Sequence, residues 1–226
     1  MALADIVRAE LSRAADPGKA GIMQKYMKST MPFLGIQTPL RRKICARVFA
    51  ENGLPSARAW RAACLALWRQ ARYREERYAA IHLTGYKSYD DFQTLDALPM
   101  YEEMIVDGAW WDYVDEIAAH RIGTLLSKYP DRVGRLMLQW SRSKDLWKRR
   151  TAILCQLKFK SETDLRLLYR CVEPALKSQE FFLRKAIGWA LRQYAWTNPA
   201  EVRRYVEKHR SSLSPLSRRE ALKNIE

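Results

Sequence analysis

The stretch WWDYVDEIAAH, residues 110–120, gathers aromatic rings and carboxylates within a strongly basic chain. Residues four apart share one face of a helix, so Trp111 and Asp115 form a pair. A tryptophan ring beside a carboxylate suits a cationic ligand, because the ring quadrupole and the negative charge attract it together. The competing interpretation is that Trp111 packs in the core and that Asp115 caps a helix or pairs with an arginine.

Two later stretches carry residues suited to phosphate. In RKAIGWALRQYA, Trp189 and Arg192 are three apart and share a helix face, and Gly188 leaves room for a backbone or ligand to approach. In KRRTAILCQLKFK, Arg150 and Lys158 are eight apart, which places them on roughly one side of a continuous helix. Arginine forks match the geometry of phosphate oxygens, so these stretches indicate a polyanionic ligand.

The elements that carry these residues recur along the chain. Arg41, Arg77, Arg149 and Arg184 each open a helix-like segment, at steps of 36, 72 and 35 residues. A period of about 36 residues predicts stacked helix pairs. We therefore expect an α-solenoid of HEAT-like repeats whose concave face is basic and brings the stretches above together. The alternative is that these arginines are helix starts with incidental surface charge.

The rest of the chain is also helical by pattern. Apolar residues recur at three- and four-residue steps, as in SARAWRAACLALWRQA, and Pro and Gly interrupt them at short intervals. The fold class predicted is all-α, with one repeat domain over residues 1–226. The first segment predicts an amphipathic helix and not a signal peptide, and no apolar run reaches the ~20 residues of a membrane span. The remaining tryptophans are predicted to pack inside the fold: Trp60, Trp68, Trp140, Trp147 and Trp196.

Charge and cysteine content narrow the function. The formal net charge is +15, and residues 142–226 hold 20 Lys and Arg against 9 Asp and Glu. Such a basic half predicts a nucleic-acid partner. Cys45, Cys64, Cys155 and Cys171 form no metal-binding spacing, so we expect buried, reduced thiols in a cytoplasmic protein without a metal.

The chain resembles the AlkD-like DNA alkylation-repair glycosylases, proteins of HEAT-like repeats, nearly from end to end. The resemblance rests on YMKSTMPFLGIQTPLRRK at 26–43, WWDYVD at 110–115, WKRRTAILCQLKFK at 147–160, and EFFLRKAIGWALRQYAWTNPAEVRRYV with the later SPLSRREALKNI. It implies hydrolysis of the N-glycosidic bond of positively charged N3- and N7-alkylated purines in duplex DNA. It also implies no cofactor and no base flipping, and we expect a monomer that joins the nucleoid when it binds DNA.

The resemblance also assigns residues. It places the catalytic carboxylate at Asp115 and the two active-site tryptophans at Trp111 and Trp189. DNA contacts fall on Arg150, Lys158, Arg192, Tyr26, Gln37 and Thr38.

Two other functions stay open from the sequence. A basic helical-repeat protein can bind distorted DNA or structured RNA without catalysis, and the basic C-terminal part fits that function equally well. Helical repeats also serve as scaffolds for other proteins, although the arginine clusters count against this role.

Overall fold

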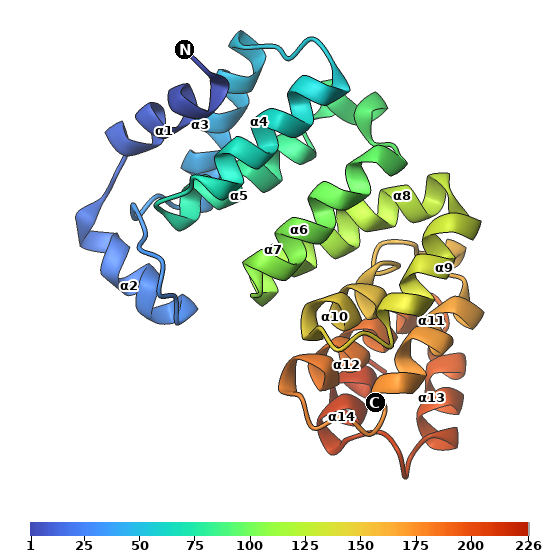
Figure 1. The fold of residues 1–226 in the computed structure, drawn as a ribbon. Helices are drawn as coiled ribbons and strands as arrows, with labels where there is room; N and C mark the ends of the chain where they lie inside the picture. Colours follow the sequence, from blue (N-terminus) through green and yellow to red (C-terminus); the bar gives the residue numbers. More distant parts are fainter. Residues whose placement is uncertain (226) are drawn as a thin grey trace. The chain divides into compact units, whose positions relative to one another are not determined.

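A computed structural model describes residues 1–225, and these residues form helices and turns without a strand (Figure 1). The all-α prediction is confirmed. Helices that lie close in the sequence also pack on one another, as in α4 with α5 and α10 with α12, which is the arrangement of a helical repeat.

The chain divides into two compact units, Met1–Met100 and Tyr101–Glu226, with the boundary inside α6. The first unit and the boundary helix comprise α1 (Leu3–Arg13), α2 (Pro17–Met27), α3 (Thr38–Glu51), α4 (Ala57–Arg69), α5 (Arg74–Thr84) and α6 (Leu98–Gly108). The second comprises α7 (Trp111–Glu116), α8 (Gly123–Lys128), α9 (Pro130–Trp140), α10 (Leu146–Leu154), α11 (Leu165–Val172), α12 (Phe181–Ala195), α13 (Pro199–Lys208) and α14 (Pro215–Leu222). The prediction of one domain over residues 1–226 stays a prediction.

The helix starts follow from local side chains. The Asp145 carboxylate accepts hydrogen bonds from the amides of Trp147 and Lys148 at the start of α10, and Asp164 caps α11 in the same way. Proline occupies the first helical position of α2, α9, α13 and α14, where its fixed φ suits the helix and its missing N–H costs nothing. The breakers in the sequence therefore begin helices as well as end them.

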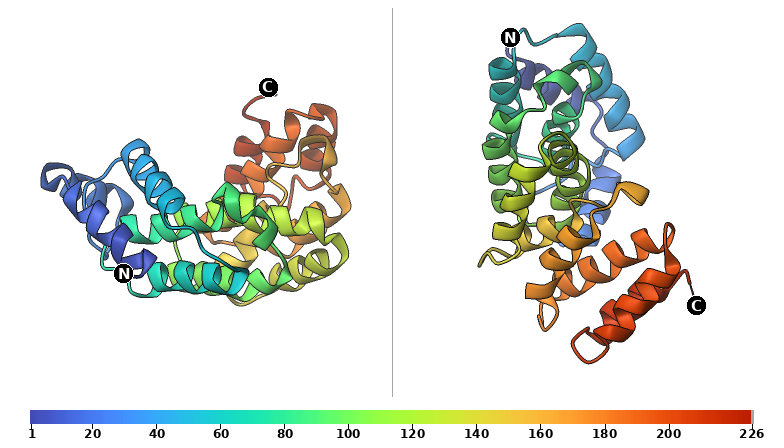
Figure 2. Two further views of the ribbon diagram at one scale, coloured as in Figure 1. Left: turned by 90° about the horizontal axis from the view of Figure 1, so that it is seen from above. Right: turned by 90° about the vertical axis from the view of Figure 1, so that its right-hand side faces the viewer.

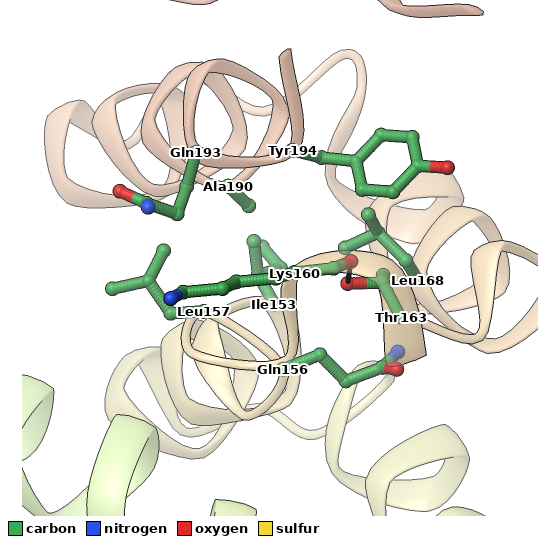
Figure 3. A pocket seen from close by; sticks show the side chains of 9 residues that line it. All are labelled: Ile153, Gln156, Leu157, Lys160, Thr163, Leu168, Ala190, Gln193 and Tyr194. Atoms are coloured by element: carbon green, nitrogen blue, oxygen red, sulfur yellow. Dashed lines mark hydrogen bonds between the residues drawn. The ribbon is translucent and has the colours of Figure 1, made fainter. Parts of the chain in front are cut away.

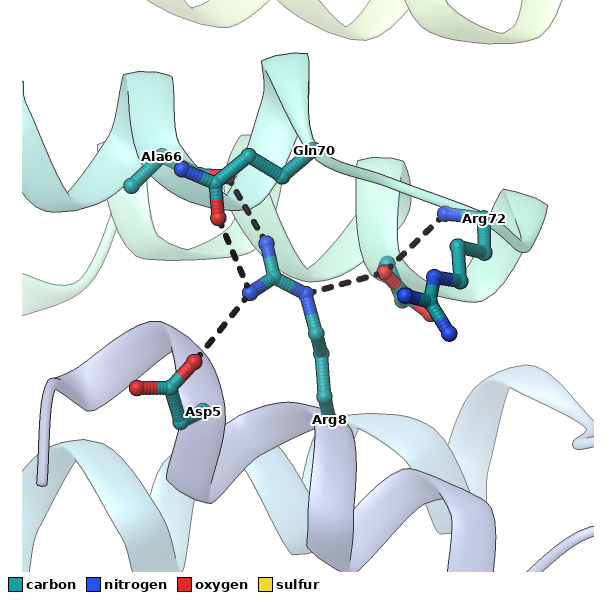
Figure 4. A network of polar contacts seen from close by, with 6 residues as sticks. Asp5, Arg8, Ala66, Gln70 and Arg72 are labelled. Carbon is teal, nitrogen blue, oxygen red and sulfur yellow. Dashed lines mark hydrogen bonds and ion pairs between the residues drawn. The ribbon is translucent and has the colours of Figure 1, made fainter.

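In the first unit, Arg8 ties α1 to α4 and α5 (Figure 4). Its Nη2 donates to the Ala66 carbonyl at 2.8 Å, and its Nε donates to the Glu76 carboxylate at 3.2 Å. Its Nη1 reaches the Gln70 side chain at 3.2 Å. One partly buried guanidinium on α1 thus satisfies polar groups of two other helices, α4 and α5, which fixes how the helices of this unit meet.

Glu75 holds the segment before α3 in place. Its carboxylate accepts hydrogen bonds from the backbone amides of Leu34, Gly35 and Ile36 at 2.9–3.1 Å, and the residue is 0% exposed. Gly35 has φ of +85°, and a Cβ there would lie 2.0 Å from the carbonyl oxygen of Asp16. Only glycine fits this position, so the segment that leads into α3 has a single well-defined path.

In the second unit, the helices pack in succession (Figures 1 and 2). α10 contacts α7, α9, α11 and α12, and α12 contacts α13 and α14. The core between α10 and α13 contains fully buried aliphatic residues such as Leu154, Leu183, Leu191 and Val202. α10 and α12 are therefore the central helices of this unit, and side chains on their outer faces have a rigid base.

The arginines that recur with the repeat period occupy the same position in their helices. Arg41, Arg77, Arg149 and Arg184 are each the fourth residue of a helix, in α3, α5, α10 and α12. The first two contact aromatic rings: the Arg41 guanidinium lies 4.5 Å from the ring centroid of Tyr78, and that of Arg77 lies 4.5 Å from Trp68. The repeat period therefore does mark equivalent helix positions. Arg41 and Arg77, however, pack inside their unit and do not line an open surface.

All four cysteines are free and buried, which confirms the prediction of buried thiols. Burial raises the pKa of Cys45 and of Cys171 to about 12, and it raises the pKa of Cys155 as well. No helix within residues 1–225 is both long enough and apolar enough to cross a bilayer.

Candidate functional site

The centre of the site is an ion pair between α7 and α10. Arg150 Nε donates to Asp115 Oδ1 at 2.7 Å, and Arg150 Nη2 donates to Asp115 Oδ2 at 2.8 Å. This bidentate geometry is the strongest form of the arginine–carboxylate interaction. The Arg150 side chain is 5% exposed and that of Asp115 is 13% exposed. Asp115 thus pairs with an arginine, as the competing interpretation held, yet the carboxylate keeps access to the surface.

Arg150 is also anchored to α12. Its Nη1 donates to the carbonyl oxygen of Phe182, and its guanidinium carbon lies 5.9 Å from the Phe182 ring centroid. Phe182 packs in turn on Trp147 at 5.0 Å and on Trp110 at 5.5 Å between ring centroids. Trp110 therefore packs inside the unit. The guanidinium of Arg150 therefore links α7, α10 and α12, and it lies over a cluster of packed aromatic rings.

A π-helical segment follows Asp115. Residues Ile117–Ile122 form this segment and connect α7 to α8 without a break. Segments of this kind widen the helix locally and often occur at functional sites. Gly123 follows, and a Cβ there would lie 2.8 Å from the carbonyl oxygen of Cys155, at the end of α10. The absent side chain lets this helix approach α10 closely, which supports the position of Asp115 against Arg150.

The surroundings make Asp115 more basic than an exposed aspartate. Burial raises the pKa of Asp115 above its ordinary value of 3.8, and the neighbouring charge of Asp112 acts in the same direction. The hydrogen bonds and the positive charge of Arg150 lower the pKa and oppose this rise. The site thus holds a carboxylate with increased affinity for a proton or for another positive charge.

The two predicted active-site tryptophans differ in exposure. Trp111 is the first residue of α7 and is 37% exposed, one turn before Asp115. The interpretation of Trp111 as a core residue is therefore wrong. Trp189 is partly buried and packs against the core of the second unit. It lies two helical turns after Phe182 on α12, so the helix that holds Arg150 at its start also carries Trp189.

The arginine predicted to grip phosphate on α12 already has a partner. Arg192 Nη1 donates to Glu220 Oε2 on α14 at 2.8 Å, and Lys185 Nζ lies 2.9 Å from Glu220 Oε1. The hydrogen bond from Lys185 and the charges of both cations lower the pKa of Glu220. A Cβ on Gly188 would lie 2.4 Å from the Cβ of Glu220, so the space at Gly188 is filled by α14 and not by a ligand.

Lys158 does not share a helix with Arg150. α10 ends at Leu154, so the prediction that these two residues lie on one side of a continuous helix is wrong. Lys158 is exposed on the loop that follows, where it lines an open cavity of about 490 Å³ with Ser127 and Glu162. The role of Lys158 in DNA binding stays a prediction, and it rests on the resemblance.

Three predicted DNA contacts lie in the first unit and are exposed there. Tyr26 is 79% exposed on α2, and Gln37 and Thr38 are exposed at the start of α3. The hydrogen bonds from residues 34–36 to Glu75 directly precede Gln37 and Thr38. The fold therefore presents these side chains to the surface from a fixed backbone.

Of the five tryptophans predicted to pack inside the fold, Trp196 is exposed. The prediction of packing is confirmed for Trp60, Trp68, Trp140 and Trp147, which are all buried. It is wrong for Trp196, which is 71% exposed at the end of α12. Its spacing of seven residues from Trp189 was the available signal, because this spacing returns to the same side of a helix.

Fold and site together define the class of the protein: a basic, all-helical repeat protein with a carboxylate–arginine pair one helical turn from an exposed tryptophan. The family model of the DNA alkylation repair enzymes matches residues 7–225, and the chain belongs to this family.

The solved structures similar to the chain include the following two. One is described as a predicted DNA alkylation repair enzyme from Enterococcus faecalis, at 29% identity and a TM-score of 0.84, over 93% of this chain and 96% of that one. The other is smu.31 from Streptococcus mutans UA159, at 16% identity and a TM-score of 0.60, over 82% of this chain and 92% of that one, and it supports the fold alone. No curated protein matches the chain.

Proposed function

We propose that the protein is a monofunctional DNA glycosylase that hydrolyses the N-glycosidic bond of N3- and N7-alkylated purines in duplex DNA. The observation that carries the proposal is Asp115: a nearly buried carboxylate with a raised pKa, held by Arg150 and accessible beside the exposed ring of Trp111. Such a group suits a positive charge that forms next to it.

The chemistry needs little from an acid. A purine alkylated at N3 or N7 already carries a positive charge, so it leaves the sugar as a neutral base with the electrons of the broken C1′–N bond. The sugar then develops oxocarbenium character, which Asp115 stabilises by charge and the Trp111 ring stabilises by its quadrupole. Water supplies the oxygen that bonds to C1′, and its proton passes to the carboxylate or to solvent.

The fixed geometry of the pair favours this role. Arg150 grips both carboxylate oxygens and is itself bound to the Phe182 carbonyl, so Asp115 keeps its orientation before the substrate arrives. A charge that is already oriented costs no reorganisation when the sugar cation forms. By the family resemblance, Trp189 is the second aromatic group at the sugar, and the lesion stays stacked in the duplex.

The phosphates have several proposed partners. Each would bind phosphates of the DNA backbone: Lys158 and Arg192 in the second unit, and Tyr26, Gln37 and Thr38 in the first. Exposure supports this for Lys158 and for the three residues of the first unit. Arg192 would share its guanidinium between Glu220 and DNA, with its Nη1 bound to Glu220 and its other nitrogen atoms directed to phosphate.

A base-release assay tests the proposal. Duplexes carrying 7-methylguanine or 3-methyladenine are incubated with the protein and with Asp115→Asn, and free base is measured. We expect release by the unchanged protein and none above background by Asp115→Asn, whose amide oxygen still accepts a hydrogen bond from Arg150. Trp111→Ala serves as a second variant. The Trp111 side chain is exposed, so a loss of base release in this variant is not explained by a loss of the fold. Release by Asp115→Asn at the normal rate contradicts the role of Asp115.

A second candidate is a DNA-binding protein without catalysis. The observation that favours it is the same ion pair, because Arg150 already neutralises much of the charge of Asp115. This candidate predicts strong, salt-dependent binding to methylated duplex with no free base at any enzyme concentration. The unchanged protein in the assay above therefore distinguishes the two functions directly.

A further inference from the structure

Trp196 exposes more of its ring than any packing role requires. It is 71% exposed, whereas Trp140 and Trp147 in the same unit are 4% and 7% exposed. A tryptophan offers one of the largest contact areas of any side chain, together with a polar N–H that tolerates a wet surface. Such a ring at the surface is suited to contact with a partner, and the neighbouring residues indicate which one.

The ring continues a row of aromatic residues along α12. Phe182, Trp189 and Trp196 follow one another at seven-residue steps, and Trp196 keeps helical angles, with φ of −65° and ψ of −22°. Each seven-residue step turns the side chain by only about 20°, so the three lie along one side of the helix. Phe182 packs beneath Arg150, Trp189 is partly buried, and Trp196 is exposed. The row leads from the ion pair to the surface.

Polar and cationic groups flank the exposed end of this row. Gln193, one turn before Trp196, lines a small cavity opposite Lys160 on the loop after α10 (Figure 3). Lys160 is exposed and has a left-handed φ of +52°. Arg192 also lies one turn before Trp196. An exposed aromatic ring one helical turn from Arg192, within residues 142–226 that hold 20 Lys and Arg against 9 Asp and Glu, fits a polyanion with a flat or apolar backbone component better than it fits an apolar protein surface.

We propose that Trp196 packs against the deoxyribose–phosphate backbone of the bound duplex, away from the reacting sugar. This inference rests on the proposed function, which places the lesion beside Trp189 and Asp115. Seven residues of helix span about 10 Å. At about 3.4 Å per nucleotide along one strand, Trp196 meets the backbone roughly three nucleotides from the lesion. It is a positioning residue that fixes the register of the duplex, not a catalytic one.

The first measurement is affinity for a long duplex over a range of salt concentrations. Trp196→Ala should bind about tenfold more weakly, as expected for losing the contact area of one large ring. The slope of log affinity against log salt should not change, because no charge is removed. Trp196→Phe should recover most of the affinity. Val106→Ala removes another exposed apolar side chain, on α6, and should bind normally.

The second measurement is the rate of base release from duplexes trimmed one base pair at a time on each side of a single 7-methylguanine. The unchanged protein should lose efficiency when one side becomes shorter than about three nucleotides, and Trp196→Ala should show no further loss there. Equal affinity of Trp196→Ala and the unchanged protein overturns the proposal, and so does a defect that persists on the shortest duplexes.

The same experiment separates this inference from the proposed function. If the protein releases base normally and Trp196→Ala binds normally, the inference fails and the proposed function stands. If the protein releases no base but Trp196→Ala binds duplex about tenfold more weakly than the unchanged protein, the proposed function fails and the DNA contact of Trp196 stands. If the unchanged protein neither binds duplex nor releases base, both are overturned.

Discussion

Each unit of the molecule contains a nearly buried carboxylate, and the two are satisfied in different ways. Glu75 in the first unit is 0% exposed and accepts hydrogen bonds from three backbone amides. Asp115 in the second unit is bound by the guanidinium of Arg150, and its side chain is 13% exposed. Glu75 holds a loop, whereas Asp115 stands beside a surface tryptophan, Trp111.

The comparison shows what separates a structural acid from one available for chemistry. Neutral amides of the backbone fix Glu75 in a place that no ligand reaches, so its charge serves the fold. For Asp115, the partner Arg150 is 5% exposed and the carboxylate side chain is 13% exposed, so the acid is the more accessible of the two. Burial alone does not distinguish the two residues, but the nature of the partner and the remaining access do.

The largest effect should come from removing the charge of Asp115. Asp115→Asn should lower the single-turnover rate of base release by about a thousandfold, because charge stabilisation and proton acceptance are both lost. Glu75→Gln should leave the rate per folded molecule unchanged. Equal losses of rate in the two variants would remove the functional distinction between these acids.

The reverse order should hold for stability. Glu75→Gln should lower the free energy of unfolding by about 3 kcal/mol, because one amide oxygen cannot replace a carboxylate that serves three buried N–H groups. Asp115→Asn should cost about 1 kcal/mol, since an acceptor for Arg150 remains. Urea unfolding followed by circular dichroism measures both, and a larger cost for Asp115→Asn contradicts the comparison.

The dependence of activity on pH should distinguish Asp115 further from a purely structural acid. Base release should fall on acidification as Asp115 takes up a proton, and the fall should begin at higher pH than for an exposed aspartate, because burial raises its pKa. Arg150→Lys keeps the positive charge but loses the bidentate hydrogen bonds that lower this pKa, so the fall should move to still higher pH. Rates measured across pH, corrected for release without enzyme, test the shift. A midpoint that moves to lower pH in Arg150→Lys would be inconsistent with this account.

The smallest effect should come from a cation outside the ion pair. Lys158→Ala should reduce the slope of log affinity against log salt by about 0.9, the value for one phosphate contact on duplex DNA. Lys177→Ala removes another exposed lysine of the second unit, which the family motif does not include, and should leave the slope nearly unchanged. Identical slopes for the two variants would remove Lys158 from the DNA interface.

Much of this arrangement could be predicted from local sequence. Helical periodicity gave the fold class, and four-residue spacing put Trp111 and Asp115 one turn apart on α7. The 36-residue period identified arginines that occupy equivalent helix positions. These features depend on residues close in the chain, or on a repeat that the whole chain follows, and both are visible without coordinates.

The remaining features depend on contacts between distant segments. The carboxylate of Glu220, on α14, accepts a hydrogen bond from Arg192 on α12. Three backbone amides about forty residues earlier in the chain donate to Glu75. The π-helical segment after Asp115 and the end of α10 before Lys158 have no local sequence signal, because tertiary packing selects them. Exposure of Trp196 likewise follows from which helices cover α12.

The four buried cysteines have a consequence for a member of this family. Electrophiles that methylate purine nitrogens also attack sulfur, and the reactive form of cysteine is the thiolate. Raised pKa values keep Cys45, Cys155 and Cys171 protonated, and packed side chains cover all four sulfur atoms. These thiols are therefore poor nucleophiles toward the same reagents that create the damage that this family repairs.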